Sequence, residues 1–269
     1  MKKNPSVLLY LLITFLISYG LWGLCVFGQR AGWFPTLSNW YMPVFLLGGN
    51  APAIATFIIF KRADPDFSFK KFLLFSFDVK QKLQYYAFTA TAVALFFIVP
   101  YLVGGLSSET APGIENQGFA GSIPLYITIP GIILMFFGGG SEEIGWRGVL
   151  QPELEKKMPL IPATFIVAVI WTVWHIPLWF ISGTTQAEVN FLLFFIGILG
   201  SSFALAAVRR ISGSVFLCII IHCATNSLQG TWPIQDDLKT KLSTTIALVL
   251  FSLCVVYGQK AFNKHRSSS

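Results

Sequence analysis

Apolar runs about twenty residues long place the tightest limit on how this chain can fold. The run at 7–28 carries no charged residue, and at about 1.5 Å per residue it can cross roughly 30 Å of hydrocarbon as a helix. A helix also satisfies each backbone N–H and C=O group within one segment, as the bilayer requires. The run therefore predicts a transmembrane helix. Comparable runs predict further spans at 41–60, 83–104, 123–150, 160–182, 189–208, 213–230 and 243–260.

The composition agrees with a polytopic membrane protein. Hydrophobic residues make up 54% of the 269 residues and charged residues only 12%, whereas soluble proteins contain about 25% charged residues. Soluble globular classes are therefore excluded. The apolar runs predict an all-α fold, a polytopic transmembrane helical bundle of about eight helices. Because the chain has no internal repeat and no dividing linker, we expect a single integral membrane domain over 1–269.

The first apolar run also resembles a secretory signal sequence, because Lys2 and Lys3 precede it. No clear small-x-small cleavage site follows the run, and Leu24 before Cys25 does not favour a lipoprotein site. We therefore expect an uncleaved anchor.

The basic residues predict how the bundle is oriented. The net charge of +7 is spread over short loops rather than over one soluble face, so no nucleic-acid partner is expected. Cytoplasmic loops of membrane proteins are rich in Lys and Arg. One side of the predicted bundle has only Arg30, Lys239 and Lys241, so both termini should be cytoplasmic and the chain should be a multi-pass protein of the plasma membrane. The other side has Lys2, Lys3, Lys61, Arg62, Lys70, Lys71, Lys80, Lys82, Lys156, Lys157, Arg209, Arg210, Lys260, Lys264 and Arg266.

Residues 66–77, on the cytoplasmic side, mix phenylalanines with lysines. Two interpretations stay open for this segment. It can lie along the membrane interface as an amphipathic helix, or it can be a loop with aromatic anchors.

A group of ionisable and polar side chains lies inside the predicted spans. A charge at the bilayer centre costs about 2.5 to 3.5 kcal/mol on insertion scales, so such residues are functional candidates by default. The alternative is a structural polar cluster that joins helices. Their number and their distribution over three helices favour function. They are Glu142, Glu143, Arg147, His175, His222 and Asn226.

The two adjacent acids are not equivalent on a helix. Glu143 and Arg147 are four residues apart and share a face, where they can pair. Glu142 is rotated by about 100° from Glu143 and escapes this pairing. We therefore expect Glu143 to be structural and Glu142 to be the free acid.

Spacing also relates Glu142 to the other two helices. A hairpin that turns at Met158–Pro159 places Glu142 and His175 at the same height, because the turn lies midway between them. On the seventh span His222 and Asn226 are four residues apart and share a face, as Trp171 and His175 do on the fifth.

These residue types suit the hydrolysis of an amide bond. An apolar cavity disfavours ionisation of a carboxylate, which suits Glu142 to act as a general base, and His175 can share the deprotonation of water. Attack on a carbonyl also needs donors for the developing oxyanion, and His222 with Asn226 can supply them. The expected reaction is peptide-bond hydrolysis within the membrane, by activated water and without a covalent intermediate.

Other catalytic classes fit less well. The chain has no His-Glu-x-x-His motif, so no cofactor is expected. Zinc remains chemically open, with Glu142, His175 and His222 as the ligand set. Ser141 lacks a Gly-x-Ser-x-Gly motif and a strand–turn–helix setting, which disfavours a serine nucleophile.

Three motifs in this order carry a family resemblance: Glu142-Glu143-x-x-x-Arg147, an aromatic-x-x-x-His at Trp171–His175, and His222-x-x-x-Asn226. Over about 120–230, which would be the catalytic core, the chain resembles the CPBP family of CAAX-prenyl endopeptidases and bacteriocin-processing or immunity proteins, also called the Abi family. The resemblance implies a glutamate-dependent intramembrane endopeptidase. Glu142 and His175 would activate water, His222 and Asn226 would form the oxyanion hole, and Glu143 with Arg147 would hold the site in shape.

The resemblance leaves the substrate open. Trp171 stands where the family usually has Phe, which preserves an aromatic wall and changes the shape of the pocket. The expected partners are the lipid bilayer and a protein or peptide substrate, either a prenylated protein cleaved near its C-terminus or a peptide precursor. The competing hypothesis is a non-catalytic membrane immunity or scaffold protein, or an ion-coupled transporter.

Two further breaks in the apolar pattern need an explanation. The glycines Gly138, Gly139 and Gly140 have low helix propensity, so they can admit a substrate or another backbone, or they can permit close helix packing. Asn50 is expected to be a packing or kink site rather than a ligand.

Overall fold

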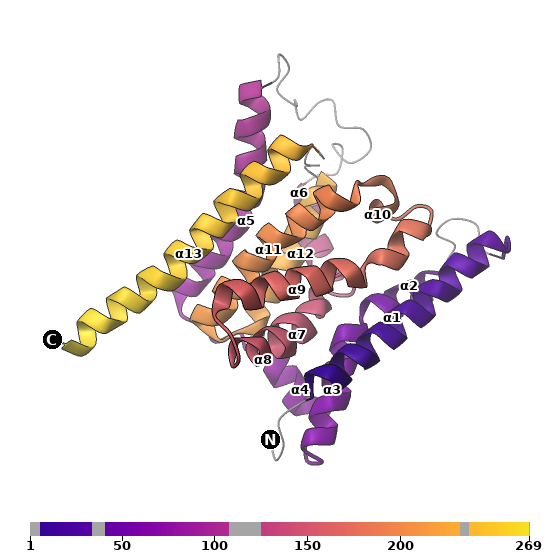
Figure 1. Ribbon diagram of the computed structural model, residues 1–269, viewed down its shortest axis with the longest axis horizontal. Helices are drawn as coiled ribbons and strands as arrows, with labels where there is room; N and C mark the ends of the chain where they lie inside the picture. Colours follow the sequence, from indigo (N-terminus) through magenta and orange to yellow (C-terminus); the bar gives the residue numbers. More distant parts are fainter. Residues whose placement is uncertain (1–5, 34–40, 108–124, 232–236, 269) are drawn as a thin grey trace.

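The computed structural model describes residues 6–33, 41–107, 125–231 and 237–268, and these residues form helices and no strand. The prediction of an all-α, polytopic helical bundle is confirmed (Figure 1). The α-helices are α1 Val7–Arg30, α2 Tyr41–Gly49, α3 Ala51–Ala63, α4 Phe69–Ser76, α5 Leu83–Ser107, α6 Leu125–Leu134, α7 Glu143–Gly145, α8 Gln151–Glu155, α9 Leu160–Trp174, α10 Thr185–Glu188, α11 Phe191–Ser212, α12 Val215–Thr231 and α13 Leu238–Ser268.

The expected count of eight spanning helices is not confirmed. In the described part of the chain, five helices are long and apolar enough to cross a membrane: α1, α5, α9 with its extension to Phe180, α11 and α13. The pair α2 and α3 would make a sixth span, but it is bent by 54°. The apolar part of α12, Val215–Gln229, is shorter than these spans.

The bend between α2 and α3 lies at Asn50. Its side-chain Nδ2 donates to the carbonyl oxygen of Leu46 at 2.7 Å and to that of Phe137 at 3.0 Å. Pro52 follows in the first turn of α3, where a missing N–H costs nothing. Asn50 is therefore a kink site, as predicted, and it also ties this kink to the segment that follows α6.

The single helix expected over 123–150 is wrong, because the glycine run interrupts it. After α6 ends at Leu134, the chain passes through a 3₁₀ turn at Gly140–Glu142, the short α7 and a π-helical turn at Trp146–Leu150. Gly139 has φ +156°, a conformation that residues with a Cβ rarely adopt.

The glycine run packs closely against α12. A Cβ on Gly139 would lie 2.7 Å from Nδ2 of Asn226 and 2.8 Å from Nε2 of His222, and a Cβ on Gly140 would collide with Sγ of Cys223. These contacts support the close-packing interpretation of the run.

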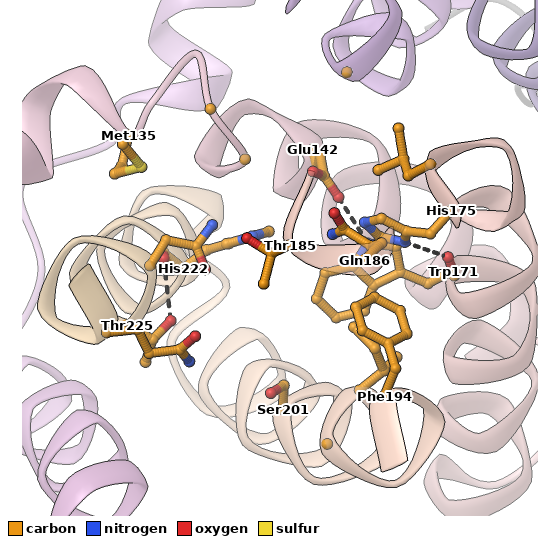
Figure 2. A pocket seen from close by; sticks show the side chains of 18 of the residues that line it. Met135, Glu142, Trp171, His175, Thr185, Gln186, Phe194, Ser201, His222 and Thr225 are labelled. Carbon is orange, nitrogen blue, oxygen red and sulfur yellow. Dashed lines mark hydrogen bonds between the residues drawn. The ribbon is translucent and has the colours of Figure 1, made fainter. Parts of the chain in front are cut away.

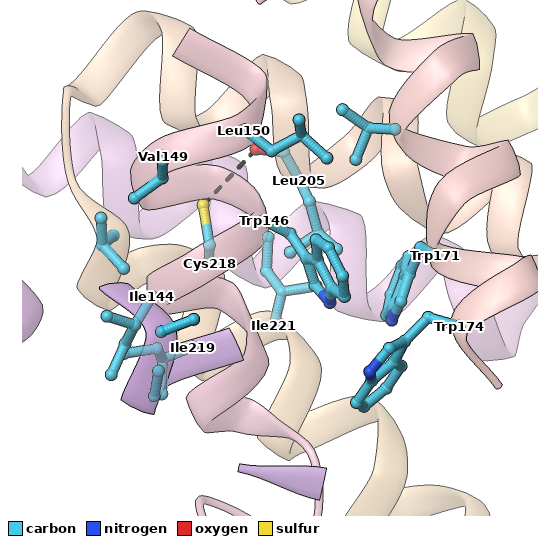
Figure 3. Packing of buried hydrophobic residues seen from close by; sticks show 14 of the residues in the cluster. Ile144, Trp146, Val149, Leu150, Trp171, Trp174, Leu205, Cys218, Ile219 and Ile221 are labelled. Carbon is cyan, nitrogen blue, oxygen red and sulfur yellow. Dashed lines mark hydrogen bonds between the residues drawn. The ribbon is translucent and has the colours of Figure 1, made fainter. Parts of the chain in front are cut away.

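The helix α11 lies at the centre of the bundle and packs against α9, α12 and α13. Gly200 permits the close approach of α13, because a Cβ there would lie 2.9 Å from the Cα of Thr245. Buried side chains from α11, α12 and the π-helical turn fill the space between them (Figure 3). Among these side chains, Sγ of Cys218 donates to the carbonyl oxygen of Leu205 at 3.4 Å.

The segment 66–77 contains the helix α4, which agrees with the interpretation as an amphipathic helix rather than as a loop. Ser68 caps its N-terminus by accepting from the backbone N–H of Lys71. Phe72 is buried, whereas Lys70 and Lys71 are exposed. On its apolar side Phe72 packs against the bundle, whereas Phe69 and Leu74 are exposed.

Candidate active site

A cavity of about 660 Å³ lies between α9, α11, α12 and the segment that follows α6. Four side chains predicted to be catalytic line it together: Glu142, His175, His222 and Asn226. In Figure 2, Trp171 on α9 and His175, which follows α9, lie on one side of the cavity, and His222 on α12 lies on the other. Residues from three separate segments are thus brought to one place.

Glu142 is held by two indole groups. It lies on the 3₁₀ turn and is 6% exposed. Its Oε2 accepts a hydrogen bond from Nε1 of Trp171 at 2.7 Å and a longer one from Nε1 of Trp146 at 3.4 Å. Hydrogen bonds to an ionised group are the strong ones, so this arrangement fixes one oxygen of the carboxylate. Its other oxygen takes part in neither of these bonds.

His175 follows the last residue of α9, and its ring orientation is set by the backbone. Its Nδ1 lies 2.8 Å from the carbonyl oxygen of Trp171. A carbonyl oxygen can only accept, so Nδ1 carries the hydrogen and donates it. In the neutral ring Nε2 therefore has the free lone pair, which is the form of imidazole that can accept a proton from water.

Glu143 and Arg147 form the predicted ion pair. Their side chains are both fully buried, and Nη1 of Arg147 lies 3.1 Å from Oε2 of Glu143. Nη2 of Arg147 also donates to Oγ of Ser202 on α11 at 3.1 Å. A buried pair of this kind is costly to break from one side, because the remaining charge is left without compensation.

Glu143 has a second partner that sequence reasoning missed. Nδ1 of His222 lies 2.8 Å from Oε1 of Glu143, so the carboxylate joins α7 to α12 as well as to Arg147. A carboxylate oxygen accepts, and Nδ1 of His222 therefore donates. Nε2 of His222 can also donate only when the ring carries both hydrogens. Two carboxylates next to this ring, those of Glu142 and Glu143, favour this charged form.

His222 and Asn226 lie on one face of α12, as their spacing predicted. Both reach Gly139, since Nε2 of His222 and Nδ2 of Asn226 are the atoms closest to the position of a Cβ on this glycine. Because Gly139 has no side chain, Nε2 of His222 and Nδ2 of Asn226 have room to point toward it together.

Trp171 contacts most of the residues that form the site, and sequence reasoning did not predict this role. Its indole N–H binds Glu142, and its carbonyl oxygen binds His175. Its ring lies 4.6 Å from the guanidinium carbon of Arg147 and has its centroid 5.5 Å from that of His222. The replacement of the usual Phe by Trp was the available signal, because only Trp adds an N–H at this position.

The sequence leaves zinc open, with Glu142, His175 and His222 as the ligand set. Within the described residues, no three His, Cys, Asp or Glu side chains come together in a way that could hold a metal ion. A catalytic zinc site needs three protein ligands.

Comparison with known proteins agrees with the motifs. Residues 124–228 match the family described as Type II CAAX prenyl endopeptidase Rce1-like. The chain is also 26% identical to CAAX prenyl protease 2 of Methanococcus maripaludis, over 97% of this chain and 96% of that protein. The matched segment contains all three motifs, so the predicted resemblance is confirmed.

Proposed function

We propose that this chain, whose residues 124–228 match the family described as Type II CAAX prenyl endopeptidase Rce1-like, is an intramembrane endopeptidase. The observation that carries the proposal is the convergence of Glu142, His175, His222 and Asn226 around one cavity. Together they provide a base and oxyanion donors, the two functions that hydrolysis of a carbonyl compound by water requires.

Glu142 and His175 are proposed to activate the water. Trp171 binds both of them, which supports a common orientation toward a water molecule between the carboxylate and Nε2 of His175. One proton passes from this water to the base while the water oxygen attacks the carbonyl carbon. Fixing base and nucleophile in this way lowers the entropic cost of the step.

His222 and Asn226 are proposed to stabilise the oxyanion. The amide of Asn226 donates in any protonation state, whereas Nε2 of His222 donates only from the doubly protonated ring. The bond to Glu143 supports this form, because the carboxylate stabilises the positive ring. When the C–N bond breaks, the base returns its proton to the leaving nitrogen. The products are a carboxylic acid and an amine.

The substrate is proposed to be a protein or peptide at the membrane. The curated relative is named a CAAX prenyl protease, and a C-terminal Cys-a-a-X sequence is the site of prenylation. The volume of the cavity, about 660 Å³, is within the range of about 300 to 1,000 Å³ typical of ligand pockets, and it can accept a few residues of extended chain.

The variant Glu142→Gln tests the proposal, because it keeps the size of the side chain and removes the base. We expect the cleavage rate of an internally quenched peptide ending in a prenylated cysteine and three further residues to fall about 10²- to 10⁴-fold. Glu188→Gln, at an exposed acid of α10, is the matched control and should cleave at the wild-type rate. Unchanged cleavage by Glu142→Gln would refute the catalytic assignment.

Metal dependence is tested separately by removing metal. If water is activated by Glu142 and His175 alone, a chelator should leave the cleavage rate unchanged, and His175→Ala should abolish cleavage. Inhibition by the chelator that is reversed by added zinc would contradict the metal-free mechanism.

A further inference from the structure

The glycine run at 138–140 leads directly into the 3₁₀ turn that carries Glu142. Glycine has no Cβ to restrict its backbone, so a run of three loses more conformational entropy on folding than other residues would. Gly139 and Glu142 both line the cavity. The geometry of the site therefore depends on the contacts that hold this run in one shape.

Backbone hydrogen bonds hold only part of the run. One of them spans it, from the N–H of Ser141 to the carbonyl oxygen of Phe136 at 2.8 Å. Within the described ranges, no backbone N–H donates to the carbonyl oxygen of Phe137, just before the run. A side chain donates to this oxygen instead, through Nδ2 of Asn50 at 3.0 Å.

The side chain of Asn50 contacts both flanks of the run. Its Nδ2 donates to the residue just before the run, Phe137, and its Oδ1 accepts from Oγ of the residue just after it, Ser141. Ser141 is buried, and buried hydroxyl groups need a hydrogen-bond partner within the protein. One amide group thus bridges the two ends of the run. We call Asn50, Phe137 and Ser141 the Asn50 clamp.

The orientation of the Asn50 amide follows from its partners. Nδ2 also donates to the carbonyl oxygen of Leu46 at 2.7 Å. Because carbonyl oxygens only accept, the amide nitrogen has to face Leu46 and Phe137, and the amide oxygen has to face the hydroxyl of Ser141. A carboxylate at position 50 would still accept from Ser141, but it would place an oxygen against the two carbonyl oxygens.

The bend at which Asn50 lies is itself fixed by other helices. Pro52 has no N–H to donate to the carbonyl oxygen of Gly48, four residues earlier, so this oxygen lacks its helical partner. Oγ of Ser18 on α1 donates to it instead, at 2.8 Å, and accepts from Nε1 of Trp174 on α9 at 2.7 Å. The clamp is therefore attached to a bend that side chains of α1 and α9 hold in place.

Neither Asn50 nor Ser141 is among the described residues that line the cavity, so their part in a reaction there is indirect. We propose that Asn50 is a positioning residue of the active site. It holds the glycine run in the shape that orients Glu142 and presents Gly139 to the oxyanion donors. The effect of the clamp on rate rests on the proposed endopeptidase function, whereas its effect on the shape of the run does not.

Two substitutions break the Asn50 clamp at opposite ends. Ser141→Ala removes the hydroxyl that binds Oδ1 of Asn50 and should lower kcat about 2- to 10-fold, the factor that one neutral hydrogen bond supplies. Asn50→Asp replaces the donor to Phe137 by an oxygen and should lower kcat about tenfold or more. KM for the quenched peptide should stay within about twofold in both variants, because neither residue lines the cavity. The double variant should lose less than the product of the two losses, since both act through one amide.

Thr56→Val is the matched control on α3. Oγ1 of Thr56 is buried and donates to the carbonyl oxygen of Pro52 at 2.8 Å. Its removal should lower the melting temperature and keep kcat within about twofold of wild type, because its partners Pro52 and Ile144 lie outside the clamp. The proposal is overturned if Ser141→Ala and Asn50→Asp keep the wild-type kcat, if KM changes rather than kcat, or if folded Thr56→Val loses as much activity as they do.

Hydrogen exchange tests the clamp without using activity. In the full-length protein in detergent, the amides of 138–142 should exchange about tenfold faster in Asn50→Asp than in wild type, while those of α9 should exchange at the same rate. Equal exchange of 138–142 in the two proteins overturns the proposal. If the wild type does not cleave the peptide, the proposed endopeptidase function toward it fails, and the exchange still decides whether Asn50 holds the run.

Discussion

The replacement Trp171→Phe isolates the hydrogen bond that holds Glu142. Phe keeps an aromatic ring beside Arg147 and His222 and removes the indole N–H that lies 2.7 Å from Oε2 of Glu142. The bond to His175 comes from the backbone carbonyl of residue 171, so it survives the substitution. The variant therefore changes the orientation of the proposed base and leaves that of the histidine.

The size of the effect follows from the strength of this bond. A hydrogen bond to a charged group contributes about 1.5 to 3 kcal/mol. At about 1.36 kcal/mol per tenfold change in rate, its loss should lower kcat about 10- to 150-fold. KM should change little, because the N–H points to Glu142 rather than to the substrate.

Steady-state cleavage of the quenched peptide measures this change, with Trp146→Phe as the matched control. Nε1 of Trp146 lies 3.4 Å from the same carboxylate oxygen, so its bond is weak. Trp146 is fully buried and packs against Tyr10 and Trp174, so its truncation should lower the melting temperature. We expect Trp146→Phe to keep kcat within about threefold of wild type. If folded Trp171→Phe retains the wild-type kcat, or if both variants lose activity equally, the positioning role of Trp171 is refuted.

Two further substitutions test the supporting residues. Glu143→Gln leaves a buried arginine without its carboxylate and should lower the free energy of unfolding by about 3 to 5 kcal/mol, measured by denaturant titration in detergent. A loss below about 1 kcal/mol would contradict the assigned role of the pair. Gly139→Ala should reduce kcat at least tenfold, because its Cβ would displace His222 and Asn226. Gly32, with φ +73°, has open space around a Cβ, so Gly32→Ala should leave kcat unchanged, and equal losses in both variants would contradict a specific role for the contacts at Gly139.

Local spacing was enough to predict part of the site. The pairing of Glu143 with Arg147, and the common face of His222 and Asn226, follow from the helical repeat and involve residues four positions apart. The π-helical turn from Trp146 did not disturb the first pair. The interruption at the glycine run was harder to predict, because apolar sequence continues on both sides of it.

By itself the sequence determined that this chain is a helical membrane protein and which polar residues its helices carry. Only the tertiary structure decided that Trp171 binds Glu142 across 29 positions and that His222 binds Glu143 across 79. The physical reason is that a helical repeat sets which residues share a face, whereas the rotation and depth of one helix against another depend on side-chain packing. At Gly139 and Gly140 this packing depends on the absence of a Cβ, which lets the segment before Glu142 approach α12.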